Sequence, residues 1–308
     1  MSAMRLLGLG CGEASGSAEI LLDAALMAAE HAGVEVALAR LDDLRIPGIG
    51  AGAASAGDDG PWFWDQLMES DGLIVSAPIY NRTVPGKLRL LCDRVLGPNA
   101  DVAFATEYLR MRQAGEAPAV AFPVDERLLR RDRVAGFIAV GGSLTPHWKT
   151  LALPLMHTLT FSMQIGVVDQ VQFAGAGSPA SIVLDEPAIE RAELLGRNVA
   201  DQIGRRFDDV EYKGEPGLCP MCHLSVIVVG EAGVECATCG ARGRFVVDGG
   251  DVSIEFPRDG REQSVITYAE KRAHFTEVQE TAARLASRRD QIHERARRFE
   301  NFDRLIRP

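Results

Sequence analysis

The sequence predicts an α/β fold: a doubly wound, five-stranded parallel sheet of strand order 2-1-3-4-5, then a small four-cysteine ribbon and a long C-terminal helix. Three observations lead to this prediction. Short apolar segments alternate with helical segments through the first two thirds of the chain, two Cys-x-x-Cys pairs follow, and a heptad pattern comes last. We therefore expect three units, at residues 1–209, 210–262 and 263–308.

Five apolar segments have the length and composition of buried parallel strands. Helices are expected between them, because apolar side chains recur there every three or four residues. Residues 48–60 form a Gly- and Ala-rich loop, and residues 97–133 fit no regular repeat and have the character of an insert. The expected strands cover residues 5–10, 35–40, 72–77, 134–140 and 167–173, and the expected helices cover residues 17–32, 62–70, 88–95, 150–165 and 186–207.

Charge and composition exclude several classes of protein. A net charge of −10 leaves no dominant basic surface for a general nucleic-acid binder. No apolar run approaches the roughly 20 residues that span a bilayer, and the first residues lack a signal-peptide pattern. Six cysteines in 308 residues do not form a disulfide scaffold. We expect a soluble, cytoplasmic protein that binds neither nucleic acid nor membrane.

Two loops of the predicted sheet meet where ligands bind such folds. In the order 2-1-3-4-5, the ligand crevice lies beyond the carboxyl ends of the first and third strands. Residues 10–17 carry three glycines and two serines at the start of a helix, which suits a phosphate group, although such a turn is often only a turn. Residues 76–88, SAPIYNRTVPGKL, are stiffened by two prolines. Together the loops favour a phosphate-bearing cofactor in contact with Cys11, Ser15, Gly16 and Ser17.

The second loop carries a recognisable motif. Residues 78–88, PIYNRTVPGKL, followed by Asp93, resemble the NAD(P)H-dependent FMN reductase family of flavodoxin-like flavoproteins, and so do residues 70–80, SDGLIVSAPIY. The resemblance covers about residues 3–207. It implies a flavodoxin-like fold, bound FMN, and NADH or NADPH as the electron donor.

The resemblance also implies which residues contact the flavin. Pro78, Ile79, Tyr80 and Asn81 would line the isoalloxazine ring, and Gly141, Gly142 and Ser143 would lie on its other edge. The phosphate loop departs from the family pattern, because it has Glu13 and no cation. We expect that Glu13 points to solvent, or that Arg82 or a residue of another subunit supplies the positive charge.

The two cysteine pairs predict a metal site. Cys219 and Cys222 are thirteen residues from Cys236 and Cys239, a spacing typical of two knuckles that converge on a tetrahedral metal. Expected strands at 224–229 and 244–247 make this segment ribbon-like. Zinc-ribbon and rubredoxin-like iron modules share this geometry, and we favour structural Zn over Fe. Cys92 is expected to be a buried core thiol.

The C-terminal segment predicts a helix of about forty residues. It begins with a capping box at residues 267–270, and its net charge is basic. The helix either packs on its own subunit or joins copies of the chain into a homo-oligomer, a dimer or tetramer. The heptad positions are Phe275, Val278, Ala282, Leu285, Arg289, Ile292, Ala296 and Phe299.

The expected chemistry is hydride transfer, in which a flavin takes the hydride and the protein positions the reactants. Tyr80 and His147 are the candidate catalytic residues, Trp148 could stack on a substrate ring, and His157 is expected in the core. The predicted activity passes hydride from a nicotinamide through FMN to a small acceptor: an aromatic compound, a quinone or a flavin. The alternative is a non-catalytic electron carrier or sensor whose ribbon and helix bind a partner protein.

The insert at 97–133 has two interpretations. Its mix of Phe104, Tyr108, Arg110 and Arg112 would suit a lid that covers the substrate. The other interpretation is a surface helix around residues 105–110.

Overall fold

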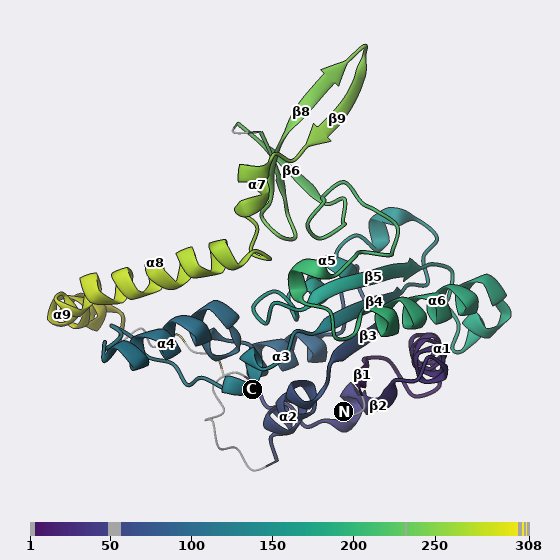
Figure 1. Ribbon diagram of the computed structural model, residues 1–308, viewed down its shortest axis with the longest axis horizontal. Coiled ribbons are helices and arrows are strands. Elements are labelled where there is room, and N and C mark those ends of the chain that lie inside the picture. The colour runs from purple at the N-terminus through teal and green to yellow at the C-terminus, as the bar shows by residue number, and fades with distance from the viewer. Residues whose placement is uncertain (1–3, 49–56, 232, 301–303, 305, 307–308) are drawn as a thin grey trace.

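Alternating strands and helices form one parallel sheet, as the sequence predicts (Figure 1). The computed structural model describes residues 4–48, 57–231, 233–300, 304 and 306, so most of the expected Gly- and Ala-rich loop lies outside the described residues. The strand order β2-β1-β3-β4-β5 confirms the flavodoxin-like fold class. The strands are β1 (Arg5–Gly10), β2 (Glu35–Arg40), β3 (Gly72–Pro78), β4 (Val134–Val140) and β5 (Gly166–Phe173).

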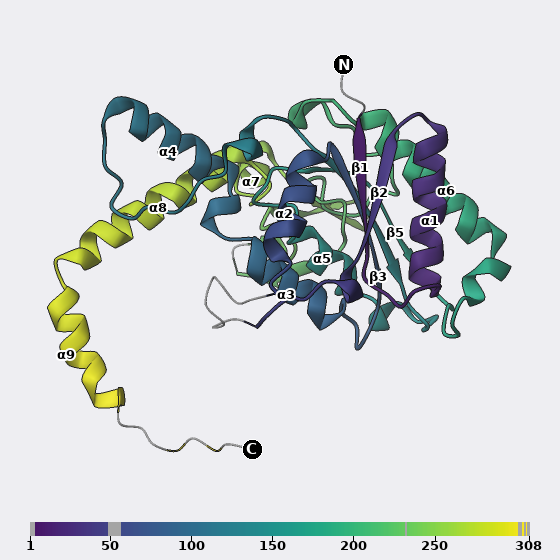
Figure 2. The same ribbon diagram turned by 90° about the horizontal axis from the view of Figure 1, so that it is seen from below.

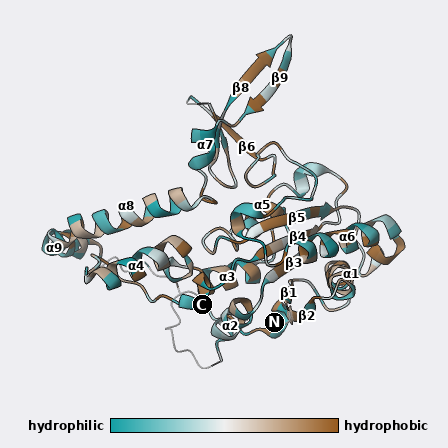
Figure 3. Cartoon of the chain, viewed as in Figure 1, coloured by the Kyte–Doolittle hydropathy of each residue, from teal (hydrophilic) through white to brown (hydrophobic). Residues whose placement is uncertain are grey.

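Helices cover both faces of this sheet (Figure 2). Neighbouring residues of a strand point to opposite faces, so Leu6 packs in one core cluster and Leu7 in the other. Figure 3 shows hydrophobic residues concentrated in β3, β4 and β5. One face is covered by α1 (Ser17–His31) and α6 (Glu186–Gln202), and the other by α2 (Gly60–Glu69), α3 (Gly86–Val95) and α5 (Ala152–His157).

The helices α1 and α6 touch through a glycine. A Cβ atom added to Gly196 of α6 would lie 1.9 Å from the backbone oxygen of Ala25 in α1. Only glycine therefore permits this approach, which brings the two helices together over the sheet.

Two helices end several residues earlier than the sequence predicts. The helix α5 stops at His157, because the hydroxyls of Thr158 and Thr160 donate to the backbone oxygens of Leu155 and His157 and compete with the helical pattern. The helix α6 stops at Gln202, because Gly204 takes a φ of +88°.

The insert forms a helix, α4 (Val102–Ala114), capped by Asp101, whose carboxylate accepts from the backbone nitrogens of Ala103 and Phe104. The nitrogen of Val102 donates to Ser162 O at 3.0 Å, which places α4 near the start of β5, at the amino edge of the sheet. Short 3₁₀ turns join the other elements: η1 (Leu41–Asp43), η2 (Pro98–Ala100), η3 (Glu126–Leu129), η4 (Pro146–Trp148), η5 (Ser181–Leu184) and η6 (Phe207–Asp209).

The cysteine ribbon is a four-stranded antiparallel sheet of order β6-β7-β8-β9. Its β8–β9 hairpin turns through Gly249 and Gly250, both with positive φ, and projects from the body of the molecule (Figure 1). Only two of its strands were expected from the sequence. The elements are β6 (Ile227–Gly230), β7 (Gly233–Cys236), β8 (Arg242–Asp248), β9 (Asp251–Glu255) and the short helix α7 (Arg258–Glu262).

The C-terminal segment is helical, as predicted, but the expected helix of about forty residues is broken into two. Two helices, α8 (Tyr268–Ala286) and α9 (Arg289–Glu300), are separated by a turn at residues 287–288, where the Ser287 hydroxyl donates to Arg284 O. The predicted cap is present, since Thr267 Oγ1 accepts from Glu270 N at 3.2 Å. The oligomer interpretation stays a prediction.

The two halves of the heptad have different surroundings. Phe275 of α8 is buried against Phe104 and Tyr108 of α4, whereas Ile292 and Phe299 of α9 are 45% and 65% exposed. Figures 1 and 2 both show α8 beside α4 and α9 leading away from the body. None of the described helices has the length and apolar character that a membrane span needs.

Candidate functional site

A groove of about 300 Å³ lies at the carboxyl edge of the sheet, where the loops after β1, β3, β4 and β5 meet. Seven residues that the sequence singled out line it together: Glu13, Gly16, Ser17, Pro78, Ile79, Tyr80 and Gly142. The crevice at the switch point is therefore formed by the loops from which it was predicted.

One end of the groove has the chemistry of a phosphate site. The helix α1 begins at Ser17, so its first backbone N–H groups point out of the helix without an intrahelical acceptor. The hydroxyl oxygen of Ser17 is buried and has no hydrogen-bond partner among the described residues. An unpartnered buried hydroxyl is costly, and a phosphate oxygen in the groove would satisfy it.

A buried carboxylate, that of Glu19, holds the loop between β1 and α1. Glu19 accepts a hydrogen bond from Ser15 N at 2.7 Å and forms an ion pair with Arg40, at the end of β2. Glu13 is exposed, and its backbone oxygen accepts from Gly16 N at 2.9 Å. Arg40 is paired with Glu19 beside this loop, and neither Arg40 nor Arg82 is among the described residues that line the groove.

The middle of the groove is an open slot whose walls include apolar and small residues. Pro78 and Ile79 line it on one side, and Gly142 and Gly177 on another. A Cβ atom at Gly142 would lie 3.0 Å from the Cα atom of Gly177, so a side chain there would push these loops apart. Such a slot suits a flat aromatic ring.

The loop after β3 is held by a tight turn as well as by its prolines. Tyr80 and Thr83 exchange two backbone hydrogen bonds, of 2.8 and 3.0 Å, around Asn81 and Arg82. Both central residues have positive φ, 47° and 71°. Tyr80 lines the groove and is 55% exposed, while Asn81 and Arg82 are exposed on the turn and do not line it.

The prediction for Cys11 needs correction. Its side chain is buried in the core, its Sγ donates to Leu9 O, and its backbone nitrogen donates to Ser76 O. Cys11 therefore offers neither its thiol nor its amide to the groove, and burial raises the pKa of the thiol. Cys92 is a buried core thiol, as expected, and burial raises its pKa to about 11.

The loop after β4 leads from the groove to the surface. Gly141 N donates to Phe173 O, and Ser143 Oγ lies 2.8 Å from Thr145 Oγ1. His147 and Trp148 are exposed on η4, with their ring centroids 6.0 Å apart, and neither lines the groove. His157 is buried, as expected.

Three features of the site were missed from the sequence. The loop after β5 contributes Gly177, Ser178 and Pro179 to the groove, and its Gly-Ser-Pro composition was the available signal. Glu19 and Arg40 were also missed. The end of β2 beside the end of β1 could have identified Arg40, since Gly10 pairs with Arg40 in the parallel register.

The insert does not cover this groove. Tyr108 of α4 is buried, and its hydroxyl donates to Val120 O at 2.8 Å, near the opposite edge of the sheet. The lid interpretation is therefore wrong for the groove of the same chain, and the surface helix is the interpretation that the structure supports.

The residues present fit FMN. The Ser17 end supplies a hydroxyl and free helical amides for a phosphate, and the Pro78–Gly177 slot admits a flat ring. FMN contains both parts in one molecule.

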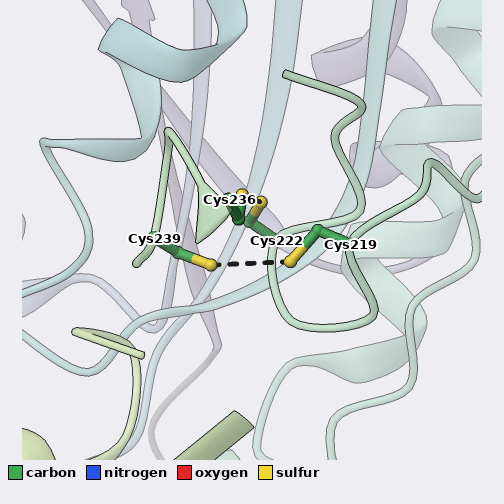
Figure 4. Close-up of side chains that lie close together, drawn as sticks. All are labelled: Cys219, Cys222, Cys236 and Cys239. Carbon is green, nitrogen blue, oxygen red and sulfur yellow. Dashed lines mark hydrogen bonds between the residues drawn. The ribbon is translucent and has the colours of Figure 1, made fainter. Parts of the chain in front are cut away.

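The four cysteines form a second site (Figure 4). Their four Sγ atoms lie within 4.8 Å of one another, with 3.6 Å between Cys219 and Cys239 and 3.4 Å between Cys222 and Cys236. Four thiolates around a tetrahedral Zn²⁺ are separated by about 3.8 Å, from Zn–S bonds of about 2.3 Å. The cluster therefore has the dimensions of a closed metal site.

Each cysteine pair is followed by a residue in the left-handed region. Gly240 follows Cys239 with a φ of +73°, and His223 follows Cys222 with a φ of +59°. Glycine takes this conformation without strain, whereas histidine does not. The His223 ring stacks on Tyr212, with centroids 3.7 Å apart and planes 8° from parallel, which offsets part of that cost.

Comparisons with known proteins agree with this geometry. A flavone synthase of Aspergillus candidus is 37% identical over 297 residues, covering 90% of this chain and 89% of that protein. The solved structure of a flavone reductase has a TM-score of 0.82 at 26% identity and covers 99% of this chain and 100% of its own. An iron-sulfur flavoprotein of Methanocaldococcus jannaschii is 24% identical over 214 residues, 65% of this chain and 97% of that protein.

The family model described as NADPH-dependent FMN reductase matches residues 4–179, more than half of the chain. The match includes the loops after β1, β3 and β4, with the unpartnered Ser17 hydroxyl and the Pro78–Tyr80 wall. The chain belongs to the NADPH-dependent FMN reductase family and is a flavin-dependent oxidoreductase.

Proposed function

We propose that the protein binds FMN and moves hydride between NAD(P)H and a planar aromatic compound of the flavone class. The groove at the carboxyl edge carries this proposal, because it joins a phosphate site at Ser17 to an open slot whose walls include apolar and small residues. The names of the two relatives that cover most of this chain, a flavone synthase and a flavone reductase, support the choice of substrate.

In the reducing direction, the proposed net reaction saturates one C=C bond of the acceptor. A hydride from the nicotinamide and a proton from water are added to the two carbons of a conjugated C=C bond, which gives NAD(P)⁺ and the saturated product. A synthase would run the same step in reverse, so one site could catalyse both the reduction and the oxidation. Bound FMN would supply the carrier for the two electrons.

The chain's own groups would hold the reactants. Ser17 and the first amides of α1 bind the phosphate, and Pro78, Ile79 and Gly142 hold the ring and exclude water from one face. Tyr80 borders the open side of the groove, where the acceptor enters, and its hydroxyl can pass a proton. His147 lies five residues beyond Gly142 on the exposed loop and does not line the groove, so this proposal gives it no contact with the reactants.

The cysteine cluster has a structural role in this proposal. All four positions of a tetrahedral metal are filled by thiolates, so no position remains for a substrate. We propose Zn²⁺ as the metal, with the ribbon folded around it.

The test is anaerobic turnover of the purified, FMN-loaded protein with NADH or NADPH and the parent flavone. We expect nucleotide oxidation coupled to an equal amount of saturated product, measured by chromatography. Tyr80→Phe would lower kcat, whereas the exposed control Thr276→Ala would not. Flavin reduction by nucleotide without any product would support the electron-carrier alternative, and no flavin reduction by either nucleotide would overturn the proposal.

A further inference from the structure

A second cavity, of about 290 Å³, lies at the opposite edge of the sheet from the groove. Its lining comes from the start of β5, the segment after α6, the first cysteine knuckle and the start of α8. It is therefore walled by all three units of the chain. The residues that matter here are His157, Phe161, Gln164, Tyr212, His223 and Tyr268.

The hydrogen bonds of His157 fix its tautomer. The side-chain nitrogen of Gln170 donates to the backbone oxygens of Cys222 at 2.9 Å and His223 at 3.2 Å, so its side-chain oxygen is the acceptor that faces His157. That oxygen lies 2.7 Å from His157 Nε2, which must therefore carry the proton. The other ring nitrogen, Nδ1, is left as a bare acceptor.

No described residue satisfies that acceptor. His157 is 1% exposed, and its Nδ1 is buried without a hydrogen-bond partner. Burial lowers the pKa of His157 to about 4, so the ring is neutral at pH 7. A buried acceptor without a donor is costly, which points to a partner that the chain does not supply.

The cavity walls define the chemistry of that partner. Four aromatic rings, those of Phe161, Phe207, Tyr212 and Tyr268, form part of the wall, and the His157 and Phe161 ring centroids are 5.7 Å apart. No lysine or arginine is among the described lining residues, and Asp208 is the single carboxylate among them. A phosphate or carboxylate ligand would find no positive charge there, whereas a neutral aromatic molecule would stack on the walls.

The backbone around the cavity also departs from relaxed geometry. Among the described non-glycine residues, six have positive φ: Ser15, Asn81, Arg82 and Ala180 in the loops of the flavin groove, and Gln164 and His223 in this cavity. Such conformations persist where the surrounding structure over-determines them, and they cluster at ligand sites. The second cavity thus shares this property with the groove.

We propose that this cavity is a second binding site, for an uncharged hydroxylated aromatic compound of two or three fused or linked rings, whose O–H donates to His157 Nδ1. A cavity of about 150 Å³ holds one benzene ring, so 290 Å³ admits this size. The ligand would contact helix α5 at His157, the start of β5 at Gly166 and Val167, and the metal knuckle at His223, and would thereby join the ribbon to the sheet unit.

The experiment uses the full-length, FMN- and metal-loaded protein with 2-naphthol as the probe and 2-methoxynaphthalene as its non-donating analogue. Calorimetry measures all binding, and the flavin absorbance identifies binding in the groove, which perturbs the flavin. We expect a class of 2-naphthol sites that leaves the flavin spectrum unchanged. In that class 2-methoxynaphthalene should bind about tenfold more weakly, the value of one hydrogen bond.

Substitutions in the cavity test whether the 2-naphthol sites that leave the flavin spectrum unchanged, the flavin-silent class, lie there. Met221 lines the cavity and packs half-buried against the cysteine cluster, so Met221→Trp fills the cavity, Met221→Leu is the matched control, and the metal content of both variants is measured. Met221→Trp should abolish the flavin-silent class and keep flavin reduction by NAD(P)H, while Met221→Leu keeps both. The proposal is overturned if wild type has no flavin-silent class, if Met221→Trp retains it, or if both probes bind in it equally well.

Discussion

Ser17 Oγ is buried at the first turn of α1 without a hydrogen-bond partner among the described residues. In the absence of a ligand this hydroxyl lowers the stability of the protein, and with a phosphate beside it the same hydroxyl contributes to binding. The hydroxyl therefore lowers the stability of the ligand-free protein but raises its affinity for the phosphate. One substitution at Ser17 can separate these two effects.

We therefore expect Ser17→Ala to raise the Kd for FMN about tenfold, the value of one hydrogen bond to a charged group. The ligand-free variant should melt no lower than ligand-free wild type, because the unpartnered hydroxyl is gone. Fluorescence titration and thermal melts measure the two quantities. Riboflavin, which lacks the phosphate, is the control and should bind both proteins equally; an equal loss of riboflavin affinity would contradict the phosphate assignment.

Cys11 shows why one residue of the site could not be predicted. Its place in a Gly- and Ser-rich loop indicated contact with the cofactor, but the backbone leaves β1 with its side chain directed into the core, against Leu9 O. The sequence shows that Cys11 belongs to the loop. Whether its side chain points into the groove or into the core depends on the direction in which the backbone leaves β1, and the sequence does not show this direction. Arg40 was missed for a related reason, since it is distant in sequence and adjacent only through the β1–β2 register.

At the scale of elements, polar and aromatic contacts fasten α8 to the body, and the contacts of Lys271 and Phe275 are two of them. Lys271 is buried, and its Nζ donates to Gln164 Oε1 at 2.9 Å and Ile266 O at 2.7 Å. One turn further on, Phe275 packs edge-on against Phe104 and Tyr108, with centroids 5.1 and 5.3 Å away. Polar and aromatic contacts thus hold α8 against the body, whereas every residue of α9 (Arg289–Glu300) is exposed.

Lys271 gives α8 a defined pH dependence. Burial lowers the pKa of Lys271 to about 8, while the unfolded chain keeps the ordinary value near 10.5. Between these values the unfolded chain binds more protons, so this group's contribution to stability rises as pH increases and is constant below about pH 8. Relative to Lys271→Met, wild type should gain up to about 3 kcal/mol of unfolding free energy between pH 8 and 10.5. A pH-independent difference in denaturant titrations would contradict this.

The aromatic contact can be tested separately. We expect Phe275→Ala to cost about 3 kcal/mol of local stability, because it removes a buried ring from between two others. Hydrogen exchange should accelerate throughout α8 and α4, with the strands of the five-stranded sheet unchanged. Phe299→Ala is the matched control: its ring is 65% exposed, so exchange in α8 should stay as in wild type. Unchanged protection of α8 in Phe275→Ala would contradict this packing role.

At the scale of the whole molecule, periodicity predicted the sheet well and the long helices less well. All five strands lie within one residue of their predicted bounds, because buried parallel strands are continuous apolar runs between polar loops. Helix ends were misplaced where Thr158, Gly204 and Ser287 interrupt an apolar period that continues beyond them. The position of the insert could not be predicted, because its partner Phe275 lies far along the chain.

The ribbon and the sheet should respond differently to loss of the metal. The ribbon's buried cluster consists of the four cysteines, Ala241 and Phe256, so its core contains little besides the metal ligands. The five-stranded sheet has its own cores on both faces. A small domain with so little buried apolar surface depends on its metal for folding.

We therefore expect a chelator, with a thiol-reactive agent to open the cluster, to release one Zn²⁺ per chain and to make residues 210–262 sensitive to protease. The 1–209 unit should keep its bound FMN, because the groove lies at the sheet edge opposite the contacts with the ribbon. Cys222→Ser should reproduce the loss, whereas Cys92→Ser, which alters a buried thiol outside the cluster, should retain the metal. Metal analysis and limited proteolysis measure these outcomes. Iron in place of zinc, with the red colour of a four-cysteine iron centre, would overturn the structural role, because such a site can relay electrons to the flavin.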